Sequence, residues 1–540
     1  MNISSIDLSV IVVYLIGIML IGILSVRRKA ATGEEYFLAG RSLKWPVVGA
    51  ALFASNISTI HLVGLAEGGY QHGLVIGNFE WMATFTLIVL SLVFVPFYFK
   101  SKITTLPEYL EKRYSRLART IMAMMSIASA LLIHIGISLY AGAAVFEEFF
   151  GLNVIASIVV ISVVTAIYTV IGGLTAVVVT ETVQTVILLA GAVLITLLAL
   201  FALPEVGIGS VAEFRAATKP EQLSMLHASN DQGYAWYAFL FGYPVLGVWY
   251  WCTDQTIVQR ALGAKDQLNA QHGALFAGAL KILPLFLMVL PGVLGYILFK
   301  EQIGDNAAKT LPVMINELVP SGLKGIIAAA LLAALMSTIA AALNSAGTLM
   351  AVDIVGHFRP QTTDRQQVLV GRLTAIVVML LAMAWSTQGD KFGSIFEAIN
   401  KMPAQFLAPP ITVVFLWGVF WRRGTAQAAL TTLILGFTLG FVLFLIDLPA
   451  FGQIQWVSDA EQGLGIGFMM QAVWGFVIWS AVFVVISWMT PPPPAEQTET
   501  TTWPHPLQFL LADRFRGFGD PRLIAAILLA TMAACYAIFR

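Results

Sequence analysis

The sequence predicts an all-α polytopic membrane protein with about 14 transmembrane helices, on the strength of three observations. The 540 residues are 58% hydrophobic and 11% charged, with a mean hydropathy of +0.83, whereas a soluble domain carries about 25% charged residues. Apolar runs of about 20 residues, enough for one helix to cross a bilayer, recur along the whole chain. These runs do not alternate apolar and polar residues, which excludes a transmembrane β-barrel.

The same composition excludes several functional classes. The 30 basic and 30 acidic residues cancel, so no basic face points to a nucleic-acid partner. Cys252 and Cys535 lie in different apolar runs and suggest neither a disulfide framework nor a metal cluster. The sequence has no H-E-x-x-H, no Walker lysine and no G-x-S-x-G in a strand-turn-helix context. We therefore expect no enzyme, no cofactor and no ATP site, and an ion gradient must supply the work.

The expected crossings are joined by short loops, the longest at about 204–233 outside and 490–520 inside. The first crossing begins beside Met1 without a basic n-region, so we interpret it as a retained helix and not as a signal peptide. In chain order the apolar runs lie near residues 6–26, 45–70, 79–99, 117–149, 153–171, 180–203, 234–262, 273–299, 322–350, 367–386, 396–420, 425–446, 466–489 and 521–539.

Lysine and arginine positions predict the orientation in the membrane. With the N-terminus outside, about 21 of these residues fall on the cytoplasmic side and about 7 on the outer side. Both termini are then extracytoplasmic. We expect a multi-pass protein of the plasma membrane (the inner membrane in a bacterium), with the lipid bilayer as its surroundings.

Polar residues interrupt the second crossing. The stretch 54–61 contains Ser55, Asn56, Ser58, Thr59 and His61. Five polar residues in eight would be poorly placed against lipid, and a broken helix explains them. The carbonyls of the unwound backbone and the nearby hydroxyls would then be available as ligands for a hard cation. Packing of small polar residues against neighbouring helices is the alternative.

The ninth crossing carries two adjacent hydroxyls, Ser337 and Thr338, in a run of small residues. With the carbonyl of Ala334 one turn earlier, they would form half of a sodium site. Close packing between helices explains the small residues equally well.

Two single charges lie within apolar runs. Glu80 heads the third crossing and Lys281 lies inside the eighth. Uncompensated charges in a membrane are costly and mark function by default. The two could form a structural ion pair, or both could hydrogen-bond a polyhydroxylated ligand. On its own, His61 would be interpreted as a packing residue. Its place in the cluster with Asn56 is the reason to consider it as a ligand-binding residue.

Aromatic residues crowd the seventh crossing, with Tyr250 and Trp251 deepest. Gly242, Pro244 and Gly247 just upstream predict a second helix break there. Two interrupted helices about five crossings apart indicate an inverted-repeat transporter with a binding site near the membrane midplane.

Several longer segments resemble the sodium/solute symporter family and, within it, the sodium/glucose cotransporter branch. They are EYFLAGRSL (35–43), LFASNIS (52–58) followed by His61, FEW (79–81), TLPEYL (105–110), YTVIGGLTAV (168–177), WYWCTDQ (249–255) and IVQR (257–260). The resemblance covers roughly residues 34–424, and the remainder is similar mainly in topology.

The resemblance implies a leucine-transporter-type core with a five-plus-five inverted repeat. An N-terminal helix and connecting loop (1–44) would precede the first repeat (45–203). The outer loop 204–233 would separate it from the second repeat (234–424), and peripheral helices with the inner loop would follow (425–540). The first helix of each repeat would be broken.

The resemblance also implies the site residues. Sodium would be bound by the carbonyls of Ala54, Ile57 and Ala334 and by the hydroxyls of Ser337 and Thr338. Na⁺ is then a co-transported ion and not a cofactor. Tyr250 is expected to be the inner gate and Phe396 the outer gate. The expected sugar contacts are Asn56, His61, Glu80, Tyr250, Trp251, Lys281 and Asn400.

Four positions depart from the pattern of glucose transporters. Gly247 stands where those proteins have a hydrogen-bonding Thr or Asn. The local motif aligns Asn400 with a sugar-contacting Gln, whereas counting back from Pro409-Pro410 selects Lys401. Glu181 replaces an Asp near the inner end of the sodium path, and Glu67 is unusual in the outer half of the broken helix. These changes concern the identity of the sugar and not the sodium coupling.

The leading interpretation is sodium-coupled import of a monosaccharide by alternating access. One alternative is sodium-coupled import of an anionic solute, such as a uronate or another carboxylate, with Lys281 and Lys401 as counter-charges; Glu80 argues against it. Another alternative is a solute sensor that does not transport, although such sensors usually carry an appended signalling domain.

Overall fold

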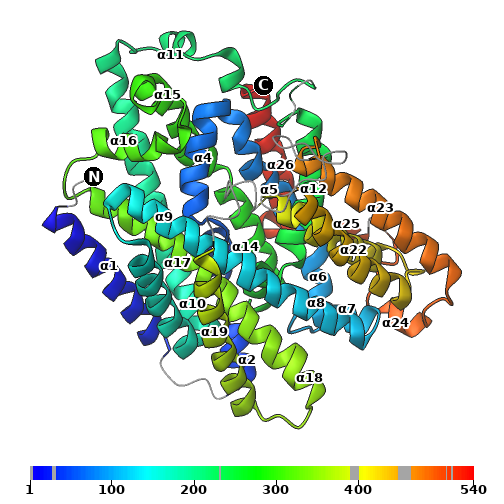
Figure 1. The fold of residues 1–540 in the computed structure, drawn as a ribbon. Coiled ribbons are helices and arrows are strands. Elements are labelled where there is room, and N and C mark those ends of the chain that lie inside the picture. The colour runs from blue at the N-terminus through cyan, green and yellow to red at the C-terminus, as the bar shows by residue number, and fades with distance from the viewer. Residues whose placement is uncertain are drawn as a thin grey trace.

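The computed structural model describes residues 4–26, 32–229, 231, 233–388, 400–447, 464–505, 508–511 and 515–540. Within these ranges the chain is nearly all helical, and extended pairing is limited to two isolated bridges. Among the described residues, eleven helices are long and apolar enough to cross a membrane. The helices pack side by side as an elongated bundle (Figure 1), which confirms the predicted all-α polytopic fold.

The α-helices vary widely in length. The longer ones are α1 (Ser5–Leu24), α3 (Trp45–Asn56), α4 (Thr59–His72), α5 (Asn78–Val89), α8 (Arg116–Ser129), α9 (Ser138–Phe150), α10 (Val154–Ala202), α14 (Gln267–Leu280), α15 (Leu290–Ile303), α17 (Lys324–Thr348), α19 (Asp364–Ser386), α21 (Ala408–Phe420), α22 (Ala426–Asp447), α23 (Phe468–Met489) and α26 (Pro521–Ile538). The shorter ones are α2 (Gly33–Leu38), α6 (Val95–Lys100), α7 (Leu106–Arg113), α11 (Val211–Ala217), α12 (Tyr243–Gly247), α13 (Gln255–Leu262), α16 (Thr310–Leu318), α18 (Gly356–Phe358), α24 (Ala495–Glu499) and α25 (Gln508–Leu511).

Several crossings also contain π-helical segments, which are η3 (Leu90–Phe94), η4 (Ala130–Ile137), η7 (Ala238–Gly242), η8 (Val248–Thr253), η9 (Leu285–Val289), η11 (Leu349–Val355) and η13 (Pro403–Leu407). A π-turn shifts the side chains that follow it to another face of the helix, and such turns are frequent at functional sites.

Both ends of the chain lie against segments expected on the outer side. In the first turn of α1, the carboxylate of Asp7 accepts hydrogen bonds from the backbone N–H groups of Gly322 (2.9 Å) and Gly325 (2.7 Å). At the other end, the N–H of Met225 donates to the carbonyl of Phe539 at 2.7 Å. The two termini and α11 lie toward the same end of the bundle (Figure 1).

The first predicted break is confirmed. Helix α3 ends at Asn56, and Ile57 (φ −75°, ψ 106°) and Ser58 (φ −100°, ψ 172°) are extended before α4 begins at Thr59. Ser58 and His61 form a capping box at the start of α4, so the local sequence supplies partners for the amides that the break exposes. The break thus interrupts the helical hydrogen bonding at Ile57 and Ser58, within the bundle.

The predicted position of the second break is wrong. The chain stays helical through η7, α12 and η8, and the break falls later, at Asp254 (φ −85°, ψ 124°), just before α13. Pro244 lies directly after the π-helical segment η7, at the start of α12. The flanking glycines serve close packing instead: a Cβ on Gly242 would lie 2.6 Å from the carbonyl oxygen of Met469.

Four expected crossings are not separate continuous helices. The runs 153–171 and 180–203 join as α10, which is interrupted at Gly173 (φ 58°, ψ −149°). That backbone conformation favours glycine, and a Cβ there would lie 2.4 Å from the carbonyl oxygen of Tyr36. The two broken crossings are built from short elements, so the described residues contain 11 long apolar helices where the apolar runs indicate about 14.

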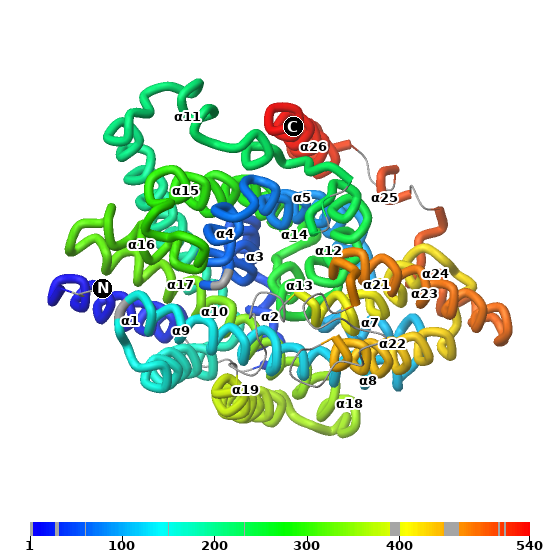
Figure 2. Tube along the Cα trace, turned by 45° about the horizontal axis from the view of Figure 1, so that its top comes forward, coloured from blue at the N-terminus to red at the C-terminus, as the bar shows by residue number. Residues whose placement is uncertain are grey.

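Helix α17 forms the centre of the bundle. Its residues from Ile327 to Thr348 are all buried, and many of them are alanine. Small side chains let neighbouring backbones approach closely, which is how helices pack in a membrane. Figure 2 shows α3, α13 and α17 surrounded by other helices, with α1, α19, α22 and α23 toward the outside.

Candidate functional site

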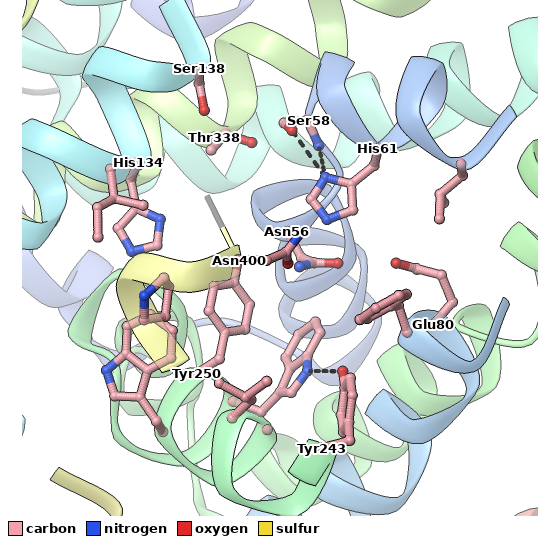
Figure 3. Close-up of a pocket in the computed structure, with 18 residues that line it drawn as sticks. Asn56, Ser58, His61, Glu80, His134, Ser138, Tyr243, Tyr250, Thr338 and Asn400 are labelled. Carbon is pink, nitrogen blue, oxygen red and sulfur yellow. Dashed lines mark hydrogen bonds between the residues drawn. The ribbon is translucent and has the colours of Figure 1, made fainter. Parts of the chain in front are cut away.

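A cavity of about 200 Å³ lies where the two broken crossings meet. Its walls combine aromatic and aliphatic side chains with a few polar groups, which is typical of a small-molecule site. Three of the π-helical segments contribute to it, namely η4, η8 and η13 (Figure 3). The lining residues are Asn56, Ser58, His61, Leu65, Phe79, Glu80, Ile133, His134, Ser138, Tyr243, Leu246, Gly247, Trp249, Tyr250, Trp251, Thr338, Asn400 and Pro403.

Glu80 and Lys281, the two single charges, are paired. The Lys281 ammonium lies 2.5 Å from a Glu80 carboxylate oxygen and also donates to the side-chain carbonyl of Asn56. Both charged side chains are buried, Glu80 at 3% and Lys281 at 1% exposure. Glu80 and Asn56 line the cavity, whereas Lys281 lies behind them. Lys281 therefore holds the side chains of Glu80 and Asn56 in place and does not itself line the cavity.

His61 occupies the same side of the cavity, at the start of α4. Its Nδ1 lies 3.0 Å from the hydroxyl and 3.2 Å from the backbone nitrogen of Ser58. Because Nδ1 accepts the Ser58 N–H, Nε2 is the ring atom available to a ligand. The helix break thus positions His61 and Asn56 together.

Tyr250 and Trp251 form an aromatic wall from η8. Their ring centroids are 5.2 Å apart at an angle of 84°. The Trp251 ring is also 5.3 Å from the Lys281 ammonium, which favours an electrostatic contact. The Tyr250 phenol lies next to Asn56 (Figure 3). This wall offers flat apolar surface of the kind that stacks on a ring-shaped ligand.

Asn400 and Lys401 have different surroundings. Asn400 lines the cavity, whereas the Lys401 ammonium lies 3.5 Å from the Asp447 carboxylate on α22. The amide of Gln405 donates to the same carboxylate at 2.9 Å. Of the two candidates, Asn400 therefore faces the cavity. The predicted outer gate, Phe396, lies outside the described residues.

Four of the five predicted sodium ligands are joined by hydrogen bonds between α17 and α3. The Ser337 hydroxyl donates to the carbonyls of Ala54 (2.8 Å) and Ala334 (2.9 Å). Thr338 donates to the carbonyls of Ala334 and Ser55, both at 3.2 Å. The fifth, Ile57, sits at the break with its side chain buried. Carbonyl and hydroxyl oxygens are the ligands a hard cation such as Na⁺ prefers.

Gly247 lines the cavity where a side chain has no room. A Cβ on it would lie 2.5 Å from Cγ2 of Thr86, and the Tyr243 ring would be 2.9 Å away. Thr86 therefore fills the space that a Thr or Asn at position 247 would need. This accounts for one departure from the glucose-transporter pattern in terms of packing.

Glu181 lies directly behind the predicted sodium position. Its carboxylate accepts a hydrogen bond from Ser55 Oγ at 2.8 Å and pairs with Arg260 at 2.7 Å. All three side chains are buried, so the charge of Glu181 is compensated within the protein.

Sequence reasoning missed several cavity residues, above all His134, Ser138 and Tyr243. His134 carried a usable signal, because an ionisable residue within an apolar run marks function by the same rule that selected Glu80. Ser138 lies on the same run, four residues later. Tyr243 lies in an aromatic-rich stretch, and nothing local distinguished it from its neighbours.

Comparison with known proteins agrees with this architecture. The family model described as the sodium:solute symporter family matches residues 36–436. Sodium/myo-inositol cotransporter 2 of Sus scrofa is 34% identical, over 92% of this chain and 78% of its own length. A sodium/mannose cotransporter of Bos taurus is 36% identical, over 93% of this chain and 89% of its own.

Among solved structures, a substrate-bound, outward-open Na⁺-coupled sialic acid symporter superposes with a TM-score of 0.75 at 22% identity, over 91% of this chain and 99% of its own. The fold is thus the leucine-transporter type with a five-plus-five inverted repeat. The extent of the family match and of both relatives leads to one conclusion: the chain belongs to the sodium:solute symporter family, a family of multi-pass membrane transporters and not of enzymes.

Proposed function

We propose that this protein imports a neutral sugar or cyclitol across the membrane together with Na⁺, by alternating access. The observation that carries the proposal is the position of Thr338. This residue lines the cavity and also donates to the carbonyls of Ala334 and Ser55 in the predicted sodium position. A residue common to both positions lets ion binding and solute binding affect one another.

The charges around the cavity favour a neutral solute. Lys281 is paired with Glu80 and Lys401 with Asp447, while the ring of His134 hydrogen-bonds Asp254. Each of these two lysines thus has an acidic partner, and a carboxylate-bearing solute would bring a further negative charge to be compensated. The related proteins named for myo-inositol and mannose carry neutral polyols, which supports the same choice.

The sodium gradient is sufficient to drive the import. One charge moving through 100 mV releases about 2.3 kcal/mol. At about 1.4 kcal/mol per factor of ten, this supports roughly 50-fold accumulation for one ion per solute. The ion would hold the broken α3–α4 crossing against α17, and its departure would free the inner gate at Tyr250.

We further propose the membrane arrangement. Residues 45–203 and 234–424 form the two inverted repeats, and 425–540 are peripheral. Both termini are extracytoplasmic, in the plasma membrane or a bacterial inner membrane. The hydrogen bonds from Gly322 to Asp7 and from Met225 to Phe539 support this orientation, because both join a terminus to a segment expected outside.

Uptake by purified protein in liposomes tests the function. An inward Na⁺ gradient should drive saturable accumulation of at least one of mannose, glucose and myo-inositol, and a K⁺ gradient of equal size should not. Glucuronate and sialic acid serve as anionic comparisons. Saturable uptake of a carboxylate without any neutral polyol would reject the proposal. Binding without counterflow would identify a sensor instead.

A further inference from the structure

His134 lines the cavity from a segment, η4, that contains none of the predicted sugar contacts. It lies in η4, is 8% exposed, and lines the cavity together with Ser138. In the close-up His134 and Glu80 lie on opposite sides of Asn56 and Asn400 (Figure 3). A ligand held by Glu80 and His61 would therefore present its far side to His134.

Asp254 determines which atom of His134 a ligand can reach. The Nε2 of His134 lies 2.9 Å from Oδ2 of Asp254, and Oδ1 of Asp254 accepts the N–H of Thr256 at 2.7 Å. An ionised carboxylate only accepts hydrogen bonds, so Nε2 must carry the proton in this pair. In the neutral ring Nδ1 is then an acceptor. Within the described part of the chain, no residue hydrogen-bonds to Nδ1.

We propose that His134 is a substrate-binding residue whose Nδ1 accepts a hydrogen bond from one substrate hydroxyl, with Asp254 as the residue that orients it. The inference rests on the proposed function and adds a specificity determinant to it. The hydroxyl concerned is on the side of the sugar or cyclitol away from Glu80. Because Nδ1 accepts, that hydroxyl must donate.

The same pair connects the substrate to the second broken crossing. Asp254 is the residue at the break, and it caps α13 through Thr256. The His134 ring lies 6.0 Å from the ring of Tyr250, the proposed inner gate. A hydroxyl bound at Nδ1 would thus be linked through His134 and Asp254 to the start of α13.

Competition binding with modified sugars tests the inference. The probes are the monodeoxy and monodeoxyfluoro derivatives of mannose, glucose and myo-inositol, measured against the parent that the wild type binds. A fluorine accepts but cannot donate. In the wild type, one carbon position should therefore lose about tenfold in affinity both as deoxy and as fluoro compound. In His134→Leu, the parent should weaken about tenfold, and the differences at that position should vanish.

Asp254→Asn gives a readout that a purely structural role would not produce. The oxygen of the new side-chain amide would accept from Thr256, so its nitrogen would donate to Nε2 and move the ring proton to Nδ1. The fluoro compound should then bind as well as the parent, while the deoxy compound stays weak. Ser129→Ala, which removes a buried hydroxyl without a described partner on α8, should keep the wild-type pattern.

The outcomes separate the two proposals. If the wild type binds none of the three parents, the proposed function fails and this inference falls with it. If the wild type binds a parent but His134→Leu keeps its full discrimination, or Asp254→Asn does not restore the fluoro compound, only the role of His134 is overturned. Should His134→Leu not fold, the fluoro result in Asp254→Asn decides alone.

Discussion

Glu181 on α10 and Arg260 on α13 form an ion pair with a separation of 2.7 Å and no exposure of either side chain. The same carboxylate accepts the Ser55 hydroxyl on α3. The pair therefore joins α3, the first half of the first broken crossing, to α13, the helix that follows the second break. A charge buried in this way is tolerated only while its partner is present.

Removing either partner of that pair should destabilise the protein strongly. We expect Glu181→Gln and Arg260→Gln each to cost about 3–5 kcal/mol, because each leaves one buried charge uncompensated. The double variant should lose less than the sum of the two. Thermal unfolding in detergent measures this, with Glu34→Gln as control, since Glu34 is 57% exposed in its pair with Arg41 and a surface pair is worth about 0–1 kcal/mol. Equal losses for Glu181→Gln and Glu34→Gln would contradict the assignment.

Ser337→Ala should raise the Na⁺ concentration needed for half-maximal uptake by about tenfold, because one hydroxyl ligand is lost. The maximal rate at saturating Na⁺ should change less. Ser345→Ala is the matched control: Ser345 lies on the same helix, is buried, and has no described hydrogen-bond partner. Sodium dependence that is the same in both variants would mean that the ion binds elsewhere.

Glu80→Gln and Lys281→Met should each weaken sugar binding about 10- to 100-fold, because buried polar groups lose their partners. The double variant separates stability from binding. Without either charge it should recover thermal stability relative to the single variants, yet it should still bind sugar poorly, since Glu80 faces the cavity. Recovery of wild-type affinity in the double variant would reduce the pair to a structural role.

Tyr250 is expected to act through its ring and its hydroxyl separately. Tyr250→Phe keeps the aromatic surface, so binding should persist while accumulation falls. Tyr250→Ala removes the gate and should abolish gradient-driven accumulation without unfolding the protein. Tyr536→Phe, which removes a hydroxyl bonded to Asn78 outside the cavity, is the control. If Tyr250→Ala concentrates sugar as the wild type does, the gate lies elsewhere.

Gly247→Thr should destabilise the protein, because its Cβ would lie 2.5 Å from Cγ2 of Thr86. Combining it with Thr86→Ala should restore much of the loss by freeing that space. The double variant would also present a hydroxyl where glucose transporters have one, so its preference among mannose, glucose and myo-inositol should shift. Thermal unfolding and competition binding measure the two effects. An undisturbed Gly247→Thr single variant would show that the backbone yields there.

Local sequence was sufficient where the physical cause is local. A helix that must bury Ser55, Asn56 and Ser58 in a membrane is costly unless it breaks, and the break is where these residues predict it. Lone charges such as Glu80 and Lys281 need partners in an apolar environment, so their importance could be inferred before their pairing was known. The apolar runs likewise determined the fold class, because each must span a bilayer to be satisfied.

The tertiary structure alone decided features that depend on neighbours far along the chain. Gly242, Pro244 and Gly247 predicted a break, yet Met469 and Thr86 pack against the two glycines. The break lies instead at Asp254, whose carboxylate caps α13 and hydrogen-bonds His134. The choice between Asn400 and Lys401 depended on Asp447, on another helix. These outcomes follow from side-chain contacts between separate crossings. The residue pattern within one crossing does not determine which other crossing packs against it.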